Sequence, residues 1–394
     1  MTVPRSDEEL ALEEGGPAWK LWLRIGLAPA DPKPLVLRAL LFAGLAWLPL
    51  LVLSLRDGLA NGDSVRPPLL RDYSVYARFL FGIVLLVLAD AAVSGRLRRA
   101  LRQFRQARLV PPSEVPAFVR IVVSARRHID SGIAEAVILA LAALAAWTST
   151  HRHLGNGIGT WAALVTDSEG GKTLTAAGWW NAVVSVPLFQ FLLLRWIFRL
   201  LVWAVALARI AGLELRLVAT HPDRAGGLGF LPLGQAGFAI LVLVSSASLS
   251  SVLANEVVYR EAALESFYPT MVVFGVLAIL VVLGPLVAFA PRLARLKREA
   301  LYAYGALSSR HDAAFGEKWV SERAEAESLL GDPDPSSLAD LATGYERAKA
   351  LRPIPIGLQA IAPILVAAAL PMLPLIALKV PLVDLLKGLA RVLM

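Results

Sequence analysis

Residues 220–237, with the sequence THPDRAGGLGFLPLGQAG, concentrate polar side chains and glycines between two strongly apolar stretches. The imidazole of His221 can exchange a proton near neutral pH, and Asp223 and Arg224 stand beside it, which suits proton relay or phosphate recognition. The glycines allow close backbone approach and precede a helix whose free amide groups and dipole favour an anion. This pattern predicts a candidate site formed by His221, Asp223, Arg224, Gly226, Gly227 and Gly229.

The same residues also fit a shaped turn with no chemistry of its own. Thr220 can cap a helical turn begun by Pro222, with Asp223 in the capping-box position and a glycine ending the turn. The spacing matches neither a P-loop nor a dinucleotide-binding fingerprint, which argues against nucleotide hydrolysis. From the sequence, both the site and the turn stay open as interpretations.

Charged and amide side chains inside apolar stretches form a second set of candidates, namely Asp90, Gln190, Arg195 and Arg199. Because an unpaired charge in hydrocarbon is costly, Asp90 is expected to pair with Arg195 or Arg199, which are four residues apart and share a helix face. Such a pair would either lock the fold or line an ion path.

Two further groups of polar residues receive a structural interpretation. Ser245 and Ser248 belong to a serine-rich stretch, and close helix packing explains such a stretch more simply than a polar pathway does. We keep both serines as candidates for a polar cavity. Arg38 and Arg78 lie near the ends of apolar stretches, where an arginine can extend to the headgroups, so neither is predicted to take part in a site.

No metal or cofactor is expected. The chain has no cysteine, and His151 and His153, with Asp167 and Glu169 downstream, lack the third convergent ligand that zinc would need. The candidate sites are therefore the loop and the intramembrane polar residues.

The composition places these candidates in a membrane protein. Of 394 residues 57% are hydrophobic and only 18% charged, and the mean hydropathy is +0.61. Several stretches run for about 20 residues with almost no charge, the length that a helix needs to cross a bilayer. They are continuous and rich in Leu and Ala, which disfavours β-strands. The predicted fold is an all-α polytopic bundle with about seven spans and a small cytoplasmic helical cap.

Four regions are predicted along the chain. Residues 1–33 form a tail and an interfacial helix, 34–291 a transmembrane bundle, 292–353 the cytoplasmic cap, and 354–394 a last span with an amphipathic C-terminal helix. The last span carries four prolines and is expected to be bent or re-entrant. The expected spans lie at 35–55, 76–94, 133–148, 179–210, 239–254, 270–290 and 354–378.

The basic residues predict the orientation. Between Arg96 and Arg127 the chain carries nine arginines and one acid, and such short basic segments stay in the cytoplasm. This places the N-terminus and the 220–237 loop inside the cell. The net charge of +8 then follows from topology, so we expect no nucleic-acid partner, although the arginines could bind anionic lipid headgroups.

Two segments carry a resemblance to known proteins. The stretches LVATHPDRAGGLGFL and SLADLATGYERAKALRPIPI, together with the proline-bearing last span, resemble a set of uncharacterised bacterial multi-pass membrane proteins. The similarity extends from about Arg195 onward. It implies a bacterial inner membrane but brings no activity, cofactor or catalytic residue.

Three functions are compatible with these features. The first is a channel or transporter-like protein in which Asp90, Gln190, Arg195 and the serines face a cavity that the 220–237 loop gates. The second is a membrane-anchored sensor or assembly factor whose cap binds a protein partner or a second copy of the chain. The weakest is a membrane enzyme acting on an anionic or lipid-linked substrate at the loop.

Overall fold

Seven helices of the described chain are long and apolar enough to cross a membrane, which confirms the predicted all-α bundle. The computed structural model describes residues 32–155, 159–165, 171–320 and 333–377, with the single residues Pro17, Lys20 and Arg24. The predicted acidic tail, nearly all of the interfacial helix and the C-terminal amphipathic helix lie outside the described residues.

The helices of the first half of the chain are α2 (Pro32–Arg56), α3 (Tyr73–Val75), α4 (Ile83–Gln106), α5 (Val115–Ile129), α6 (Gly132–Gly155), α7 (Ala176–Trp180) and α8 (Val186–Ala211). Those of the second half are α9 (Phe230–Gln235), α10 (Ala239–Tyr259), α11 (Tyr268–Leu283), α12 (Ala290–Phe315), α13 (Asp334–Lys349), α14 (Leu358–Ala369) and α15 (Leu373–Ala377). Three π-helical turns, η2 (Tyr76–Gly82), η4 (Asn181–Ser185) and η8 (Gly316–Val320), extend or join these helices. Short 3₁₀ turns are η1 (Leu69–Arg71), η3 (Pro112–Glu114), η5 (Ala236–Phe238), η6 (Leu264–Phe267), η7 (Gly284–Phe289) and η9 (Leu370–Met372).

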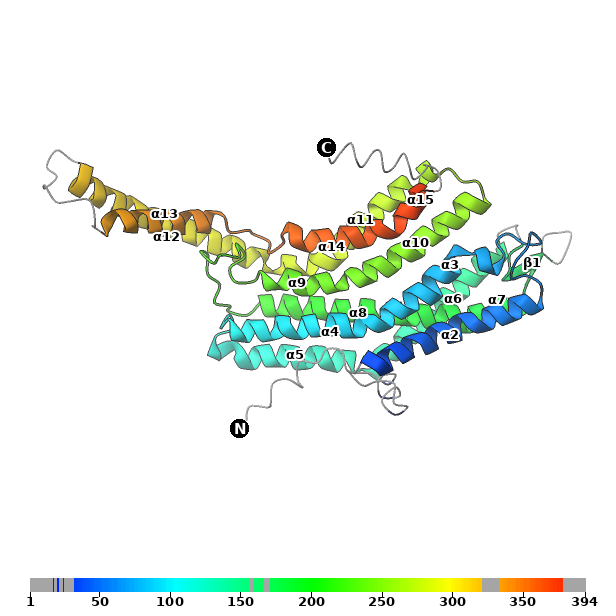
Figure 1. Cartoon of the computed structure of the whole chain (residues 1–394). Helices are drawn as coiled ribbons and strands as arrows, with labels where there is room; N and C mark the ends of the chain where they lie inside the picture. The colour runs from blue at the N-terminus through cyan, green and yellow to red at the C-terminus, as the bar shows by residue number, and fades with distance from the viewer. Residues whose placement is uncertain are drawn as a thin grey trace.

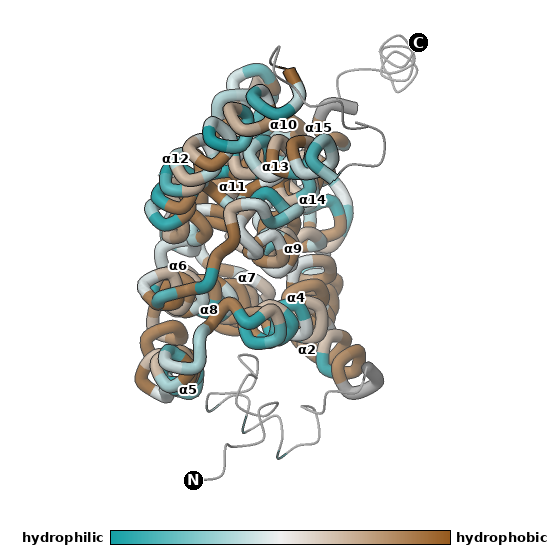
Figure 2. Tube along the Cα trace, turned by 90° about the vertical axis from the view of Figure 1, so that its left-hand side faces the viewer, coloured by the Kyte–Doolittle hydropathy of each residue, from teal (hydrophilic) through white to brown (hydrophobic). Residues whose placement is uncertain are grey.

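The spans differ in how deeply they are packed. Within its most apolar window, the span Phe230–Tyr259 is 56% buried, whereas Gly132–His151 is 17% buried. The exposed residues of the outer spans are large and apolar, such as Leu144 and Val272. Seen from the end from which α12 and α13 project, hydrophobic colour is frequent along the traces of the bundle helices (Figure 2). Apolar side chains that stay exposed on a bundle are typical of helices that face lipid. The more buried α10 is therefore a central span, and the less buried α6 is a peripheral one.

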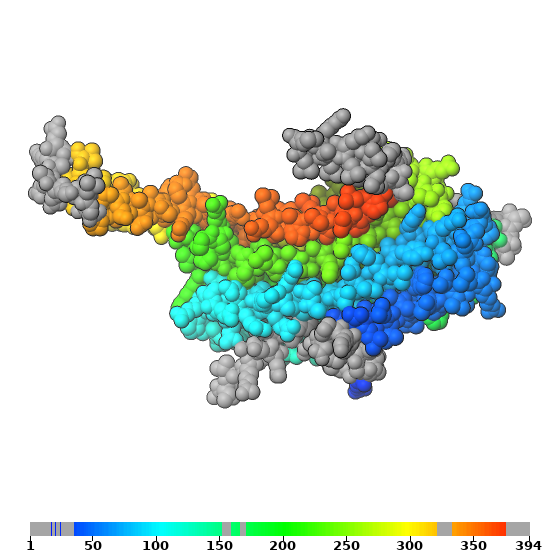
Figure 3. All heavy atoms as spheres, viewed as in Figure 1, coloured from blue at the N-terminus to red at the C-terminus, as the bar shows by residue number. Residues whose placement is uncertain are grey.

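The two ends of the bundle are different (Figure 1). At one end α12 and α13 project well beyond the other helices, which is also clear in the space-filling view (Figure 3). We call this the hairpin end. At the other end lies a two-stranded antiparallel sheet of β1 (Ala163–Val165) and β2 (Lys172–Leu174), in which Ala163 is opposite Leu174. We call this the sheet end.

The projecting hairpin grows directly out of a span. Helical structure continues over 57 residues from Leu264 to Val320, interrupted by the 3₁₀ turn η7, which begins at Gly284 and Pro285. Two tyrosines on facing helices each lie against a glycine of the opposite helix: a Cβ on Gly344 would lie 3.1 Å from the Tyr304 ring, and one on Gly305 would lie 3.8 Å from the Tyr345 ring. The glycines let α12 and α13 pack closely.

The basic segment between Arg96 and Arg127 is mostly helical rather than a loop. Its first part continues span two as the end of α4, and its second part forms α5, which packs against α8. The short connection between them contains Arg108, with a positive φ of 51°. Apart from Arg108, its arginines therefore lie on α4 and α5, whose connection is at the hairpin end of the bundle (Figure 1).

Candidate functional site

The carboxylate of Asp223 organises the 220–237 loop. Its Oδ1 accepts hydrogen bonds from the backbone N–H groups of Ala225 (2.8 Å) and Gly227 (3.2 Å), and its Oδ2 accepts one from Gly229 (2.8 Å). Gly229 is the residue before α9. The anion-binding backbone predicted in front of a helix is therefore present, but the chain's own carboxylate occupies it.

The electrostatic state of Asp223 follows from these bonds. Burial alone raises the pKa of a carboxyl group, but the three backbone donors and the His221 ring stabilise the charged form and hold the pKa of Asp223 below its ordinary value. The carboxylate is ionised at neutral pH and its oxygens are engaged. This arrangement suits a structural anchor better than a general acid.

The rest of the loop is shaped around this anchor. His221 Nδ1 lies 2.8 Å from Asp223 Oδ1, and the backbone carbonyl of Arg224 accepts a hydrogen bond from the N–H of Arg352 at 2.9 Å. Gly226 and Gly227 have φ values of 67° and 97°, which side chains with a Cβ rarely adopt. The helical turn expected after Thr220 is not formed, because residues 221–229 bend around the carboxylate instead.

His221 and Arg224 also face the hairpin. They line an open cavity of ≈ 550 Å³ with Glu346 and Arg347 of α13. Asp223 is not among the lining residues, so the three side chains predicted to share a pocket do not all open onto it.

The remaining glycines of the loop serve helix packing. A Cβ on Gly234 would lie 3.4 Å from Ala100 Cβ, and one on Gly237 would lie 3.2 Å from Arg96 Cδ. These positions let α9 and η5 lie directly against α4. Gln235, between them, accepts a hydrogen bond from Trp203 Nε1 at 2.7 Å and donates one to the carbonyl of Val282 at 2.7 Å.

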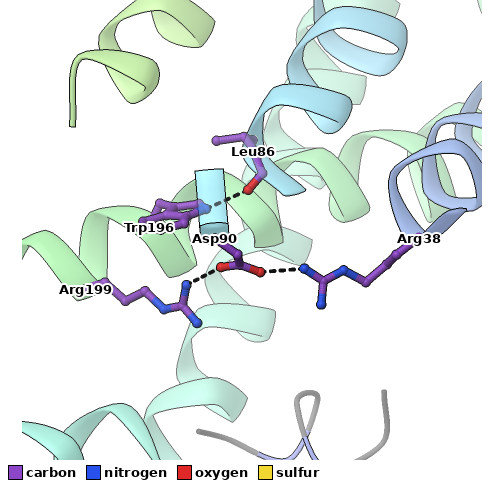
Figure 4. A network of polar contacts seen from close by, with 5 residues as sticks. All are labelled: Arg38, Leu86, Asp90, Trp196 and Arg199. Carbon is purple, nitrogen blue, oxygen red and sulfur yellow. Dashed lines mark hydrogen bonds and ion pairs between the residues drawn. The ribbon is translucent and has the colours of Figure 1, made fainter. Parts of the chain in front are cut away.

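Asp90 lies at the centre of an ion cluster between three spans (Figure 4). Its Oδ1 is 2.6 Å from Arg199 and its Oδ2 is 2.6 Å from Arg38, so α8 and α2 are both tied to α4. The pairing with Arg199 was one of the two predicted from the sequence. Arg195 is buried one turn earlier on α8.

The prediction for Arg38 was wrong. Its position near the start of a span suggested a side chain that reaches the headgroups, but only 1% of the residue is exposed. Arg38 lies on the face of α2 that packs against α4, so its side chain extends towards Asp90 instead. Beside the cluster, Trp196 Nε1 donates to the carbonyl of Leu86 at 2.8 Å, and the Arg199 guanidinium lies 4.7 Å from the Trp196 ring centre.

The serines of α10 mainly hold helices together. Ser246 Oγ donates to the carbonyl of Ala368 at 2.5 Å, and Ser250 Oγ donates to that of Pro371 at 2.6 Å. Ser245 is only partly buried, and the carbonyl of Ser248 accepts from Ser251 Oγ at 2.8 Å. Helix packing therefore explains Ser246 and Ser250, which are neighbours of the candidates Ser245 and Ser248.

The predicted intramembrane residues do not meet in one cavity. Gln190 is partly buried on α8. Among the described residues, the principal cavities are lined by none of the six, which are Asp90, Gln190, Arg195, Arg199, Ser245 and Ser248. Of the residues weighed for zinc, His151 Nδ1 lies 3.1 Å from the carbonyl of Trp147; Asp167, Glu169 and the side chain of His153 lie outside the described residues.

A cavity that the sequence did not predict lies at the sheet end. It has a volume of ≈ 140 Å³ and is enclosed by residues from three spans and two connecting segments. We call it the polar cavity. Its lining includes Arg66, Asp72, Ser74, Arg78, Phe79, Trp161, Ala162, Asn181, Val252, Asn255, Glu256, Tyr259 and Arg260.

Asp72 is the best-connected residue of the polar cavity. Its Oδ1 accepts from the N–H and Oγ of Ser74 (2.9 and 2.6 Å) and from Asn255 Nδ2 (2.7 Å). Its Oδ2 accepts from Trp161 Nε1 at 2.8 Å. All four bonds come from neutral donors, so this buried carboxylate has no bonded cation among the described residues.

Arg78 and Asn181 are less connected. Arg78 interacts electrostatically with the Asp72 carboxylate, but it makes no hydrogen bond or ion pair with any residue that the structure describes. The Oδ1 of Asn181 is buried and has no hydrogen-bond partner within the described residues. Arg78 lies within the π-helical turn η2 and Asn181 begins η4. Such turns are frequent at functional sites because they displace side chains from the regular helix register.

The residues of this cavity could not be grouped from the sequence, because they come from separate segments. Arg78 was assigned to the headgroup region from its position near a span end, and the structure instead places it in the cavity wall. Asp72 and Trp161 lie in connecting segments that carry no motif. One signal was present in the sequence: Asn255 and Glu256 end a serine-rich apolar span with polar side chains.

A second groove runs on the other side of the same helices. It has a volume of ≈ 750 Å³ and is lined mainly by apolar side chains, including Tyr76, Ala77, Phe81, Ala247 and Leu370. Helices η2 and α10 contribute different residues to the groove and to the polar cavity. The contact between η2 and α10 therefore has the apolar groove on one side and the polar cavity on the other.

Comparison with known proteins yields no relative. No family model matches the chain, and neither a curated protein nor a solved structure shows a significant match to it.

Proposed function

We propose that this chain is a membrane transport protein that binds a small polar solute in the polar cavity. The observation that supports this function is a cavity between three spans in which Asp72 has no bonded cation, Arg78 has no hydrogen-bonded or ionic partner among the described residues, and Asn181 Oδ1 has no hydrogen-bond donor there. Buried polar groups are costly unless they are paired, and they mark solute or ion pathways in membrane proteins.

The proposed orientation places the hairpin end in the cytoplasm of a bacterial cell and the polar cavity at the outer face of the inner membrane. The supporting observation is charge: the arginines between Arg96 and Arg127 lie at the hairpin end, as does the basic start of α12. Short basic segments are retained in the cytoplasm. In this orientation the cavity is the place where a solute from outside first meets the bundle.

The ion cluster of Asp90 would close the solute pathway on the cytoplasmic side of the polar cavity. Asp90, Arg38 and Arg199 join three spans between the cavity and the hairpin end, and both arginines are paired with the one carboxylate. Passage of a solute would require α2, α4 and α8 to separate there. The π-helical turns η2 and η4, one on span two and one on span four, are where the helices can change register.

Uptake by proteoliposomes tests this function. The full chain is reconstituted and its uptake of labelled anionic, cationic, zwitterionic and neutral solutes is measured. Val252→Phe introduces a ring into the polar cavity, whereas Ala247→Phe introduces the same ring on the groove side of α10. We expect at least one solute to enter, with uptake lost in Val252→Phe and retained in Ala247→Phe. Uptake of no solute, or equal uptake by both variants, would contradict the proposal.

A second candidate is a membrane-anchored sensor or assembly factor. It is favoured by the helical run from Leu264 to Val320, which connects a span directly to the hairpin. It ranks second because a protein-binding cap should carry an apolar patch. On the described part of the hairpin the exposed large apolar side chains are Tyr302, Leu307 and Val320, which are well separated along the chain. A partner or a second copy bound there would be detected by cross-linking from Tyr302.

A further inference from the structure

The polar cavity keeps two opposite charges apart. The guanidinium of Arg78 and the carboxylate of Asp72 attract each other, but no direct ion pair joins them. Elsewhere in the bundle Asp90 is in direct contact with two arginines at 2.6 Å. Asp72 is buried and Arg78 is partly buried. Opposite charges that line one cavity without contact leave room for a ligand between them.

The other charges at the cavity are already matched or lie at its rim. Arg260 and Glu256 form an ion pair with each other at 3.2 Å, and Arg66 is exposed. The groups that can recognise a ligand are therefore Arg78, Asp72 and the buried Oδ1 of Asn181. One is cationic and two can accept hydrogen bonds.

A ligand of single charge does not suit this set. A simple anion at Arg78 would lie near the carboxylate of Asp72, and a simple cation at Asp72 would lie near Arg78. At short range in a site of low dielectric constant, such a like-charge contact is strongly unfavourable. A molecule with one charge of each sign has both of its charges matched.

The volume limits the size of that molecule. The cavity of ≈ 140 Å³ is comparable to the engineered cavity of about 150 Å³ that holds benzene, a molecule of six non-hydrogen atoms. The smallest α-amino acids are about this size. Larger zwitterions would require the cavity to open.

We propose that the polar cavity is a binding site for a small zwitterion, with a carboxylate at Arg78 and a cationic nitrogen at Asp72 and the Oδ1 of Asn181. This inference rests on the proposed transport function and specifies its substrate class. The Arg78 guanidinium donates two parallel hydrogen bonds to the carboxylate, which is its preferred geometry. The ammonium group donates to Asn181, which satisfies the buried oxygen.

Binding measurements on the full chain in lipid nanodiscs test the substrate class. The probes are glycine, acetate and methylammonium, which share a size range and differ in charge. We expect glycine to bind and the two singly charged probes to bind at least tenfold more weakly. Arg78→Gln should weaken glycine binding by about 10- to 100-fold, because it removes charge-assisted hydrogen bonds. Arg71→Gln is the matched control, since Arg71 is exposed and does not line the cavity.

The alternative outcomes separate the two proposals. Acetate or methylammonium binding as tightly as glycine, or glycine binding unaffected by Arg78→Gln, overturns the zwitterion assignment. If uptake is nevertheless blocked by Val252→Phe, the transport function stands with another solute. Absence of glycine binding also overturns the assignment, and uptake of no solute overturns the transport function as well.

Discussion

The ion cluster of Asp90 and the polar cavity both place one carboxylate beside arginines between spans, but they pair these charges differently. In the cluster, Arg38 and Arg199 each contact an oxygen of Asp90 at 2.6 Å. In the cavity, Asp72 is bonded only to neutral donors and Arg78 stands apart from it. Directly paired charges hold helices against each other, whereas separated charges leave polar groups without partners that a ligand can supply.

The largest expected effect is on the cluster. Asp90→Asn would leave Arg38 and Arg199 buried without their carboxylate, and breaking a buried pair in this way costs about 3–5 kcal/mol. We expect a large fall in the unfolding temperature of the purified protein, followed by tryptophan fluorescence in one detergent. Asp63→Asn removes an exposed carboxylate that lies 3.7 Å from Arg71 and should change nothing. Equal unfolding temperatures for wild type and Asp90→Asn would show that the cluster does not hold the spans.

The spans and part of the Asp90 cluster could be predicted from the sequence. Apolar stretches of about 20 residues predicted the spans, and the cost of a lone charge in hydrocarbon predicted a partner for Asp90 on α8. The role of Arg38 was missed because depth along a span was considered and the side of the helix was not. That side is set by tertiary packing of α2 on α4, which one sequence does not encode in a readable pattern.

The candidate sites were harder to predict than the fold. In the 220–237 loop the residue types predicted an anion site before a helix, but the pattern did not predict that three backbone N–H groups of the loop would bind the chain's own Asp223. The polar cavity was not foreseen, because Asp72, Arg78, Asn181 and Asn255 come from separate parts of the chain and meet only in the folded bundle. Neither π-helical turn has a sequence signature comparable to a cap or a proline kink.

A smaller effect is expected from the wall of the polar cavity. Trp161→Phe keeps a ring but removes the N–H that donates to Asp72, and a hydrogen bond to a charged group contributes roughly 1.5–3 kcal/mol. Trp180→Phe removes a donor to the neutral carbonyl of Leu45, a bond worth about 0.5–1.5 kcal/mol. The Trp161 variant should therefore unfold at a lower temperature than the Trp180 variant. The reverse order would mean that Asp72 is not held by this bond.

The loop offers a pH-dependent test of a third buried carboxylate. The pKa of Asp223 is lowered in the folded protein, so its stabilising bonds are complete above the ordinary carboxyl value of about 4 and are lost as the pH falls through the lower folded value. The protection of residues 225–229 from hydrogen exchange, taken relative to the unfolded chain at the same pH, should be high at pH 7 and fall below about pH 4. In Asp223→Ala the exchange should be about tenfold faster already at neutral pH, with no step in this acid range. A step of the same size in the variant would assign it to another group.

The same substitution made in both regions gives the smallest stability effect and the most direct comparison. Arg78→Met removes a partly buried cation that forms no hydrogen bond or ion pair with a described residue, and replacing it by an apolar side chain of similar length is expected to change stability little. Arg38→Met takes away one of the two partners of Asp90 and should lower the unfolding temperature. Unfolding temperatures of both variants are measured without added solute and again with glycine. We expect glycine to stabilise the wild type and Arg38→Met but not Arg78→Met, because only the last has lost the proposed carboxylate partner. A marked destabilisation by Arg78→Met without solute would show that Arg78 has a structural role like that of Arg38, and the difference between the two regions would disappear.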